Sequence, residues 1–171
     1  VDEDLIRVTL ETPNKVTEKM DKLRVADAIS EIFTLFKRCN KYIDETMPWA
    51  LAKEEDKKAR LETVLYNLVE SISVGASLLE PFMPETSAKV LAQLNASKRE
   101  LEDMKEYGKY VSGTKVVEKP EILFARLDLK EVLEKVEEKK AAEEARKHEE
   151  EVANNEPVID IEAKDEIEYD D

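Results

Sequence analysis

The clearest helical pattern in the chain runs over residues 16–46. Apolar and small side chains recur there at steps of three and four, which is the spacing of one helix face. The stripe consists of Leu23, Ala26, Ile29, Phe33, Phe36, Asn40 and Ile43, and it is widened by Met20, Ile32, Cys39 and Met47. The pattern predicts one continuous helix over 16–46. Residues 1–12 are either the last turns of an earlier helix or an extended lead-in, and Pro13 limits them in both cases.

Prolines divide the next part of the chain. Pro48 has no N–H and disfavours a helical residue before it, so it predicts the end of the first helix at Met47. A second stripe over 60–79 is formed by Leu61, Leu65, Leu68, Ile72, Ala76 and Leu79. Pro81 ends that helix, and Pro84 suits the first turn of the next one. Gly75 lowers helix propensity, so it predicts the close approach of a neighbouring helix.

The pattern weakens after residue 94. Residues 95–113 are charged, "KVV" at 115–117 resembles a short strand, and 122–129 is an apolar helix candidate. Residues 130–152 combine high helix propensity with charge on nearly every side, and "VIDIE" alternates like a strand without partners. We therefore predict an all-α helical bundle over residues 1–129, followed by a charged helical or extended tail over residues 130–171.

Charge separates the same two parts. The 171 residues carry a formal net charge of −14, but residues 131–171 alone hold 17 acidic and 6 basic side chains. The bundle is therefore close to neutral, and the acidity of the whole chain does not argue against a polyanionic partner of the bundle.

Few residues offer catalytic or metal-binding chemistry. The chain has one cysteine, Cys39, and one histidine, His148, so these two types cannot build a zinc site. Cys39 lies in the apolar stripe and is interpreted as a buried thiol. We find no glycine-rich phosphate loop and no catalytic constellation, and we predict no metal site and no cofactor in these residues. No apolar run reaches the roughly 18 residues of a membrane span, so we predict no membrane partner and a cytoplasmic location.

Two residues near the break at Pro48 invite a functional interpretation. Asn40 occupies an apolar-stripe position, where an amide needs partners; it either bonds the backbone near the break or contacts a ligand. Trp49 is the one tryptophan of the chain. It either seals the end of the bundle or offers a stacking platform to an unpaired base.

The stretch "MDKLRVADAISEIFTLFKRCNKYIDETMPWALAK" resembles the anticodon-binding region of bacterial methionyl-tRNA synthetases. "LLEPFMPETSAKVLAQL" and "KPEILFARLD" are similar to later segments of that family, in the same order. The resemblance implies a class I synthetase anticodon-binding bundle that holds the CAU anticodon loop of the methionine tRNA.

The resemblance also implies roles for particular residues. Trp49 matches the tryptophan that stacks on an unpaired anticodon base, Pro48 sets the break that presents it, and Asn40 supports that geometry. Arg126 lies in a segment that folds toward the catalytic part in the family. It would touch that part or the tRNA, or else form an internal salt bridge. The tail matches the linker before a C-terminal tRNA-binding domain.

The family's other main anticodon contacts, an asparagine and an arginine, fall on a helix before Val1, so we expect weak anticodon binding by this chain alone. The parent enzyme would join methionine to its tRNA with ATP and Mg, through a catalytic domain of the same polypeptide. We expect this part to be inactive and monomeric by itself and the parent to be a homodimer in some members. The rival interpretation is a helical scaffold in which Trp49 anchors another protein.

Overall fold

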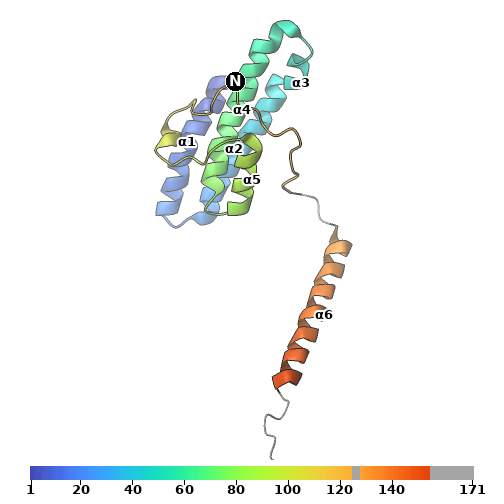
Figure 1. The fold of residues 1–171 in the computed structure, drawn as a ribbon. Helices are drawn as coiled ribbons and strands as arrows, with labels where there is room; N and C mark the ends of the chain where they lie inside the picture. Colours follow the sequence, from blue (N-terminus) through green and yellow to red (C-terminus); the bar gives the residue numbers. More distant parts are fainter. Residues whose placement is uncertain (125–127, 155–171) are drawn as a thin grey trace, which may run out of the picture. The chain divides into compact units, whose positions relative to one another are not determined.

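A computed structural model describes residues 1–124 and 128–154 of the chain. Its α-helices are α1 (Asp2–Asp21), α2 (Val25–Thr46), α3 (Pro48–Leu51), α4 (Lys58–Leu79), α5 (Pro84–Leu94) and α6 (Leu129–Asn154) (Figure 1). Single 3-10 turns follow at η1 (Glu55–Lys57) and η2 (Asp103–Lys105). None of the described residues lies in a β-strand, so the predicted all-α class is confirmed. The chain forms two units, Val1–Leu123 and Phe124–Asp171.

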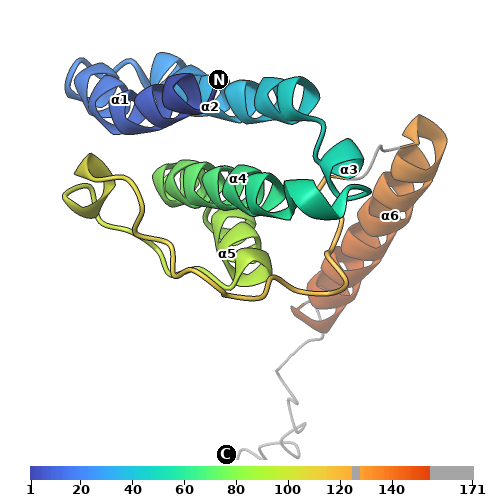
Figure 2. The same ribbon diagram turned by 90° about the horizontal axis from the view of Figure 1, so that it is seen from above.

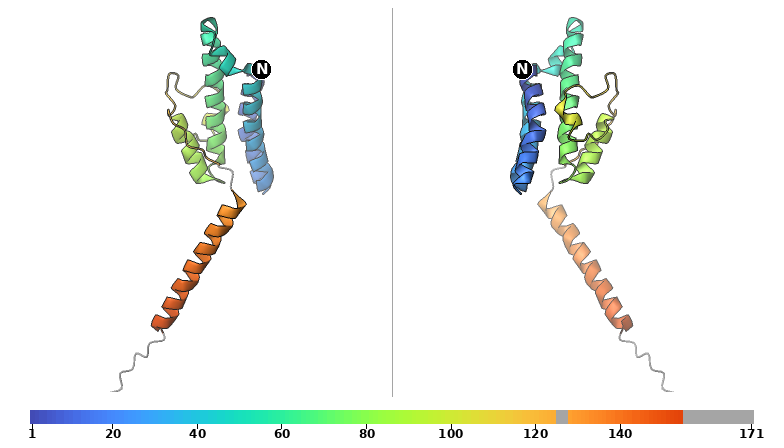
Figure 3. Two further views of the ribbon diagram at one scale, coloured as in Figure 1. Left: turned by 90° about the vertical axis from the view of Figure 1, so that its right-hand side faces the viewer. Right: turned by 90° about the vertical axis from the view of Figure 1, so that its left-hand side faces the viewer.

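Within the first unit, α4 is the central helix. Helices α1 and α2 form a layer on one side of it, and α5 packs on the other side (Figure 2). The side views in Figure 3 show the same order of layers. Because α4 is covered on both sides, most of its second half is buried, including the polar Glu70, Ser71 and Ser73. The core consists of Leu5, Val16, Ala28, Ile32, Leu35, Cys39, Tyr42, Val64, Leu68, Val74, Leu78, Leu79 and Met104.

The predicted continuous helix over 16–46 is wrong, because the chain breaks at Leu23. Leu23 has φ +56° and is 87% exposed. The N–H of Arg24 donates to the C=O of Lys19 at 2.9 Å, and the N–H of Leu23 to that of Met20 at 2.8 Å. These two bonds form a Schellman helix end, whose left-handed position is usually glycine. A leucine at this position carries no turn signal, so the sequence pattern does not predict the break.

The segment before residue 16 is helical. Helix α1 begins at Asp2 and continues through Pro13, which is buried inside it. Pro13 therefore does not limit the helix as predicted. The helix tolerates the proline because it is held by packing, since Leu5, Thr9 and Val16 are all buried on α1. The Thr9 hydroxyl lies 2.8 Å from that of Ser71 on α4, which joins α1 to the central helix.

The buried face of α2 is rotated by about one residue from the predicted stripe. Its buried side chains are Ala28, Ile32, Leu35, Cys39 and Tyr42. Phe33, a member of the predicted stripe, is 40% exposed. The prediction for Gly75 is confirmed, because a Cβ on this α4 residue would lie 2.6 Å from the Phe36 ring of α2.

A buried carboxylate holds the irregular segment after α5. Glu70 on α4 is fully buried and accepts two hydrogen bonds from the Arg99 guanidinium, at 2.7 and 2.6 Å. It also accepts the backbone N–H groups of Gly108, Lys109 and Tyr110 at 2.8–3.1 Å. Burial raises the pKa of Glu70, but the hydrogen bonds and charge of Arg99 and the two backbone amides of Lys109 and Tyr110 lower it further, and the net pKa lies below its usual value.

Two predictions after residue 94 are wrong. Residues 115–117 form no strand, and residues 122–124 are irregular rather than helical, while residues 125–127 of the predicted helix lie outside the described part. Ile122 is 79% exposed, so its apolar character does not mark a buried helix face. Local patterns in this stretch carry little information, because its path is fixed by bonds to distant residues such as Glu70.

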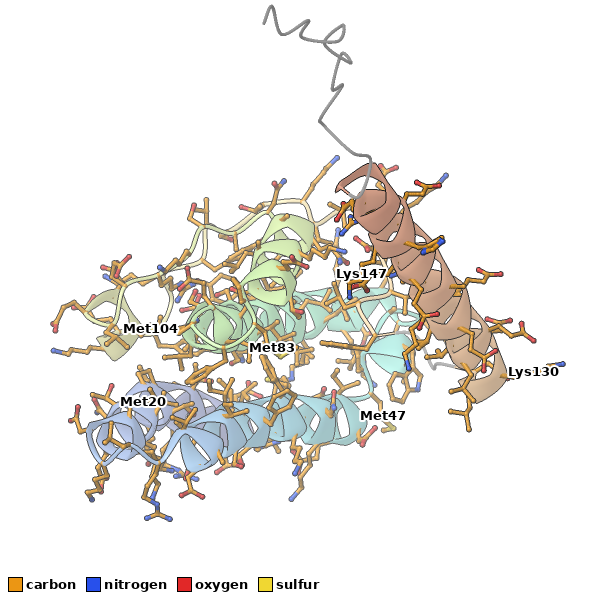
Figure 4. All side chains as sticks on the ribbon, turned by 90° about the horizontal axis from the view of Figure 1, so that it is seen from below. Met20, Met47, Met83, Met104, Lys130 and Lys147 are labelled. Carbon is orange, nitrogen blue, oxygen red and sulfur yellow. The ribbon has the colours of Figure 1, made fainter. Side chains whose placement is uncertain are left out.

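The charged helix predicted over 130–152 is confirmed as α6, which begins at Leu129. Asp128 caps its start, because its carboxylate accepts the backbone N–H of Lys130 at 2.9 Å. Figure 4 shows side chains along the length of this helix, with Lys130 and Lys147 labelled. Residues 155–171, which include the predicted strand, lie outside the described part, and the role of 130–171 as a linker stays a prediction. No described helix is long and apolar enough to cross a membrane.

Candidate functional site

The candidate site begins where α2 gives way to α3. Met47 adopts φ +44° and ψ 63°, and Pro48 is the first residue of α3. The N–H of Met47 still donates to the C=O of Ile43, while its own C=O accepts the N–H groups of Ala50 at 2.8 Å and Leu51 at 3.2 Å. The predicted helix end at Met47 is confirmed. The residue before a proline disfavours the right-handed helical region, and Met47 leaves that region. The next residue, Pro48, then begins α3.

Helix α3 presents Trp49 on its outer side. Trp49 is 55% exposed, whereas Leu51, two residues later, packs against the core. The largest fully buried side chain of the bundle is Tyr42, one turn before the end of α2. Tyr42 therefore fills the core near this break, and more than half of the Trp49 surface faces solvent.

Asn40 does not occupy the buried stripe, so that part of the sequence interpretation is wrong. It is exposed, because its neighbours Cys39 and Tyr42 take the inward positions of α2. Within the described residues its side chain forms no hydrogen bond. An exposed amide satisfies its polar groups with water, so the need for a protein partner that motivated the first interpretation does not arise.

A polar network fixes the helices behind the break, and sequence reasoning missed it. The Tyr42 hydroxyl donates to the Asp2 carboxylate at 2.9 Å and accepts the side-chain N–H of Asn67 at 3.2 Å. Both oxygens of Asp2 also accept from the Arg60 guanidinium. These contacts join the first turn of α1 to α2 and to the first half of α4. No local pattern predicts them, because Asp2 and Arg60 are 58 residues apart.

Ionisation of this network follows from its contacts. The hydrogen bond from Arg60 is the largest influence on Asp2 and outweighs partial burial, so the pKa of Asp2 falls from 3.8 to about 2. The same bond raises the pKa of Arg60. Burial raises the pKa of the Tyr42 phenol. At neutral pH the network therefore holds a carboxylate, a guanidinium and a neutral phenol.

The surface next to Trp49 carries both signs of charge. Residues 53–60 read "KEEDKKAR", and all of them are exposed. Lys57 pairs with Glu54 at 2.7 Å, and further back Glu45 pairs with Arg38 at 3.0 Å. There is no uniformly basic strip in this stretch. The exposed apolar indole of Trp49 is the group in this stretch that could distinguish a ligand.

The remaining candidate residues bear less on the site. Cys39 is buried, and burial raises the pKa of its thiol to about 12, which fits a structural thiol. Within residues 1–124 and 128–154, no group of three or more His, Cys, Asp and Glu side chains is placed to hold a metal ion. Arg126 lies outside the described residues.

Tyr107 and Tyr110 are used structurally. The Tyr107 hydroxyl donates to Asn67 at 3.2 Å, and the Tyr110 hydroxyl donates to the backbone C=O of Leu94 at 2.5 Å. Both tyrosines therefore fasten the segment after α5 to the helices beneath it.

Comparison with known proteins gives one consistent family. Residues 1–145 match the family described as the anticodon binding domain of methionyl tRNA ligase. The methionine–tRNA ligase of Clostridium perfringens is 44% identical over 171 residues, which is 100% of this chain and 25% of that protein. That of Caldanaerobacter subterraneus subsp. tengcongensis is 48% identical over 141 residues, covering 81% of this chain and 22% of its own length.

Solved structures agree. The Mycobacterium tuberculosis methionyl-tRNA synthetase in complex with methionyl-adenylate aligns with a TM-score of 0.62 and 26% identity over 73% of this chain and 25% of that one. A second structure of the M. tuberculosis enzyme, bound by methionyl-adenylate, is 30% identical with a TM-score of 0.54 over 56% of this chain. The chain thus spans a quarter or less of the length of these relatives.

Proposed function

Because this chain belongs to the family of methionyl-tRNA ligase anticodon-binding domains, we propose that it binds the CAU anticodon loop of the methionine tRNA as one part of a longer ligase. The longer protein would attach methionine to that tRNA with ATP and Mg. Relatives about four times as long support this, since this chain covers 25% of the C. perfringens ligase. Residues outside this chain would then supply the chemistry, and this part would supply selection of the tRNA.

The observation that carries the proposal is the exposure of Trp49 at the α2–α3 break. An indole that is 55% exposed leaves more than half of its surface open to a planar partner. Bases of single-stranded loops are splayed out and stacked on aromatic side chains, which contributes about 1–3 kcal/mol per base. Trp49 would act as the platform, and Pro48 would fix its direction by starting α3. Asn40 is exposed on the same helix that ends at this break, and its amide is suited to bond a base edge.

The charges near Trp49 fit recognition by stacking more than by phosphate neutralisation. Residues 53–60 hold three acidic and four basic side chains, and two of the bases are already paired, Lys57 with Glu54 and Arg60 with Asp2. Such a surface attracts a polyanion weakly. Affinity of this chain for RNA would then come from base contacts, and further contacts in the longer protein would add to it.

Fluorescence gives a direct test, because Trp49 is the sole tryptophan of the chain. An RNA stem-loop with a CAU loop is titrated into the protein, and the same stem with a scrambled loop is titrated in parallel. We expect selective quenching by the CAU loop. Equal quenching by both loops, or none by either, when the titration is repeated with the parent-length protein would favour the scaffold interpretation, in which Trp49 anchors a protein.

A kinetic test covers the longer ligase. Trp49→Ala should lower kcat/KM for the tRNA by about tenfold or more, from the lost stacking. The matched control is Leu101→Ala, since Leu101 is also half-exposed and apolar but lies beside η2 rather than at the break. Unchanged tRNA charging by the Trp49→Ala enzyme would exclude Trp49 from the site.

A further inference from the structure

The four methionines of the chain divide into two groups. Met104 is part of the core, and Met20 and Met83 pack against it. Met47 is 50% exposed and lies where α2 ends beside the short helix α3 (Figure 4). An unbranched apolar side chain held half in solvent contributes little to the fold. It lies next to the proposed base platform, Trp49, where an exposed apolar side chain can contact a ligand.

The backbone conformation of Met47 does not favour a methionine at this position. With φ +44° it occupies the left-handed region, which glycine and asparagine adopt at lower cost than other residues. The geometry of the break is secured by Pro48 and by the bonds from Ala50 and Leu51 to the Met47 C=O, and none of these needs a methionine side chain. The fold alone would favour Gly or Asn at this position.

We propose that Met47 is a second recognition residue, whose thioether contacts the same unpaired RNA base that stacks on Trp49. This inference rests on the proposed function. Two residues along a chain lie at most about 7 Å apart at their Cα atoms, and the three flexible bonds of methionine let it reach over a neighbouring ring. A polarisable sulfur packs favourably against aromatic edges and faces. Met47 and Trp49 would thus form an apolar corner for a heteroaromatic base, bounded on its outer side by charged residues.

Substitutions separate the side chain from the backbone. Met47→Asn suits the left-handed backbone and removes the thioether, whereas Met47→Leu keeps an apolar side chain and the backbone cost of methionine. In the longer ligase, Met47→Asn should raise KM for the CAU tRNA about fivefold with kcat little changed, and Met47→Leu should recover most of that loss. Unfolding by urea should show Met47→Asn to be no less stable than the parent, which excludes a folding defect.

Three other results for KM would each contradict part of the proposal. If Met47→Asn leaves KM unchanged while Trp49→Ala raises it, Met47 is no recognition residue and the Trp49 platform stands. If Asn and Leu raise KM equally, the apolar corner formed by Met47 and Trp49 is overturned, because an apolar side chain at position 47 does not restore binding. If Trp49→Ala also leaves KM unchanged, the proposed function itself fails, and the role of Met47 fails with it.

Discussion

The guanidinium of Arg99 closes over the fully buried carboxylate of Glu70 with two parallel hydrogen bonds of 2.7 and 2.6 Å. Arg99 is itself only 9% exposed. Three backbone N–H groups of residues 108–110 complete the shell around the carboxylate. A single α4 side chain thereby holds two stretches of irregular chain against the bundle.

Removing the guanidinium of Arg99 from this pair should lower the free energy of unfolding. Arg99→Met leaves Glu70 charged and buried with fewer partners, and such changes typically lower the free energy of unfolding by about 3–5 kcal/mol. Urea unfolding followed by circular dichroism measures the change. Lys98→Met is the matched control, because Lys98 is about half exposed and its partner Glu80 is too, so its loss should cost under about 1 kcal/mol. Equal effects of the two variants would show that the buried pair has no special weight.

The Asp2 carboxylate should make the bundle sensitive to acid. Its pKa is about 2 in the folded state against 3.8 without its partners, so the folded state favours the ionised form. The stability it contributes is present above about pH 4 and is lost as the pH falls toward 2. Asp2→Asn should therefore lower the urea midpoint at pH 7, and the gap between variant and parent should narrow as the pH approaches 2. Glu3→Gln, at an exposed neighbouring position, is the control, and a gap independent of pH would contradict the prediction.

A substitution at the break between α1 and α2 should increase the stability of the bundle. Leu23 is 87% exposed and left-handed, so its side chain gives little packing while its backbone is strained. Leu23→Asn should raise the free energy of unfolding by about 0.5–1 kcal/mol, since asparagine adopts this conformation more easily. Thermal unfolding measures it. Lys22→Asn, at a right-handed position with φ −92°, should give no such gain, and a gain of equal size would remove the conformational explanation.

The contact between Gly75 and Phe36 should appear as a coupling between two substitutions. A Cβ at Gly75 would meet the Phe36 ring at 2.6 Å, so Gly75→Ala should destabilise the bundle by about 1–2 kcal/mol through overpacking. In a Phe36→Leu background the clash is relieved, and the same change should gain up to about 1 kcal/mol from helix propensity. A double-mutant cycle of urea midpoints tests this, and additive effects would count against it.

RNA binding by this chain should depend weakly on salt. Each phosphate contact to a single strand contributes a slope of about −0.7 in log K against log salt. With the mixed charges over residues 53–60, we expect a slope no steeper than about −2 for the CAU stem-loop. Titrations between low and moderate salt measure it. A slope near −5 would indicate a phosphate-binding surface that stacking at Trp49 does not explain.

Several features of this protein were readable from local sequence signals. Pro48 and Pro84 placed helix boundaries correctly, because a missing N–H and a fixed φ act on the nearest residues. The charged stretch after residue 130 is helical for similarly local reasons. The prominence of Trp49 was also evident from its place after a proline, although its exposure was not.

Other features depended on the assembled bundle. The positions of α1 and α4 determine which face of α2 is buried, so the stripe predicted from the sequence differs from the buried face and wrongly includes Asn40. The break at Leu23 relies on tertiary packing to hold a strained residue that carries no turn signal.

By itself, then, the sequence determined the helical class, the breaks at prolines and the family to which the chain is similar, since these rest on residue type and short-range spacing. The tertiary structure alone decided that Tyr42 fills the core behind the break while Trp49 and Met47 remain half in solvent. It also decided that Glu70 is paired with Arg99, a partner 29 residues away. Burial and pairing at such separations are properties of packed surfaces, and a linear pattern does not specify which surfaces meet.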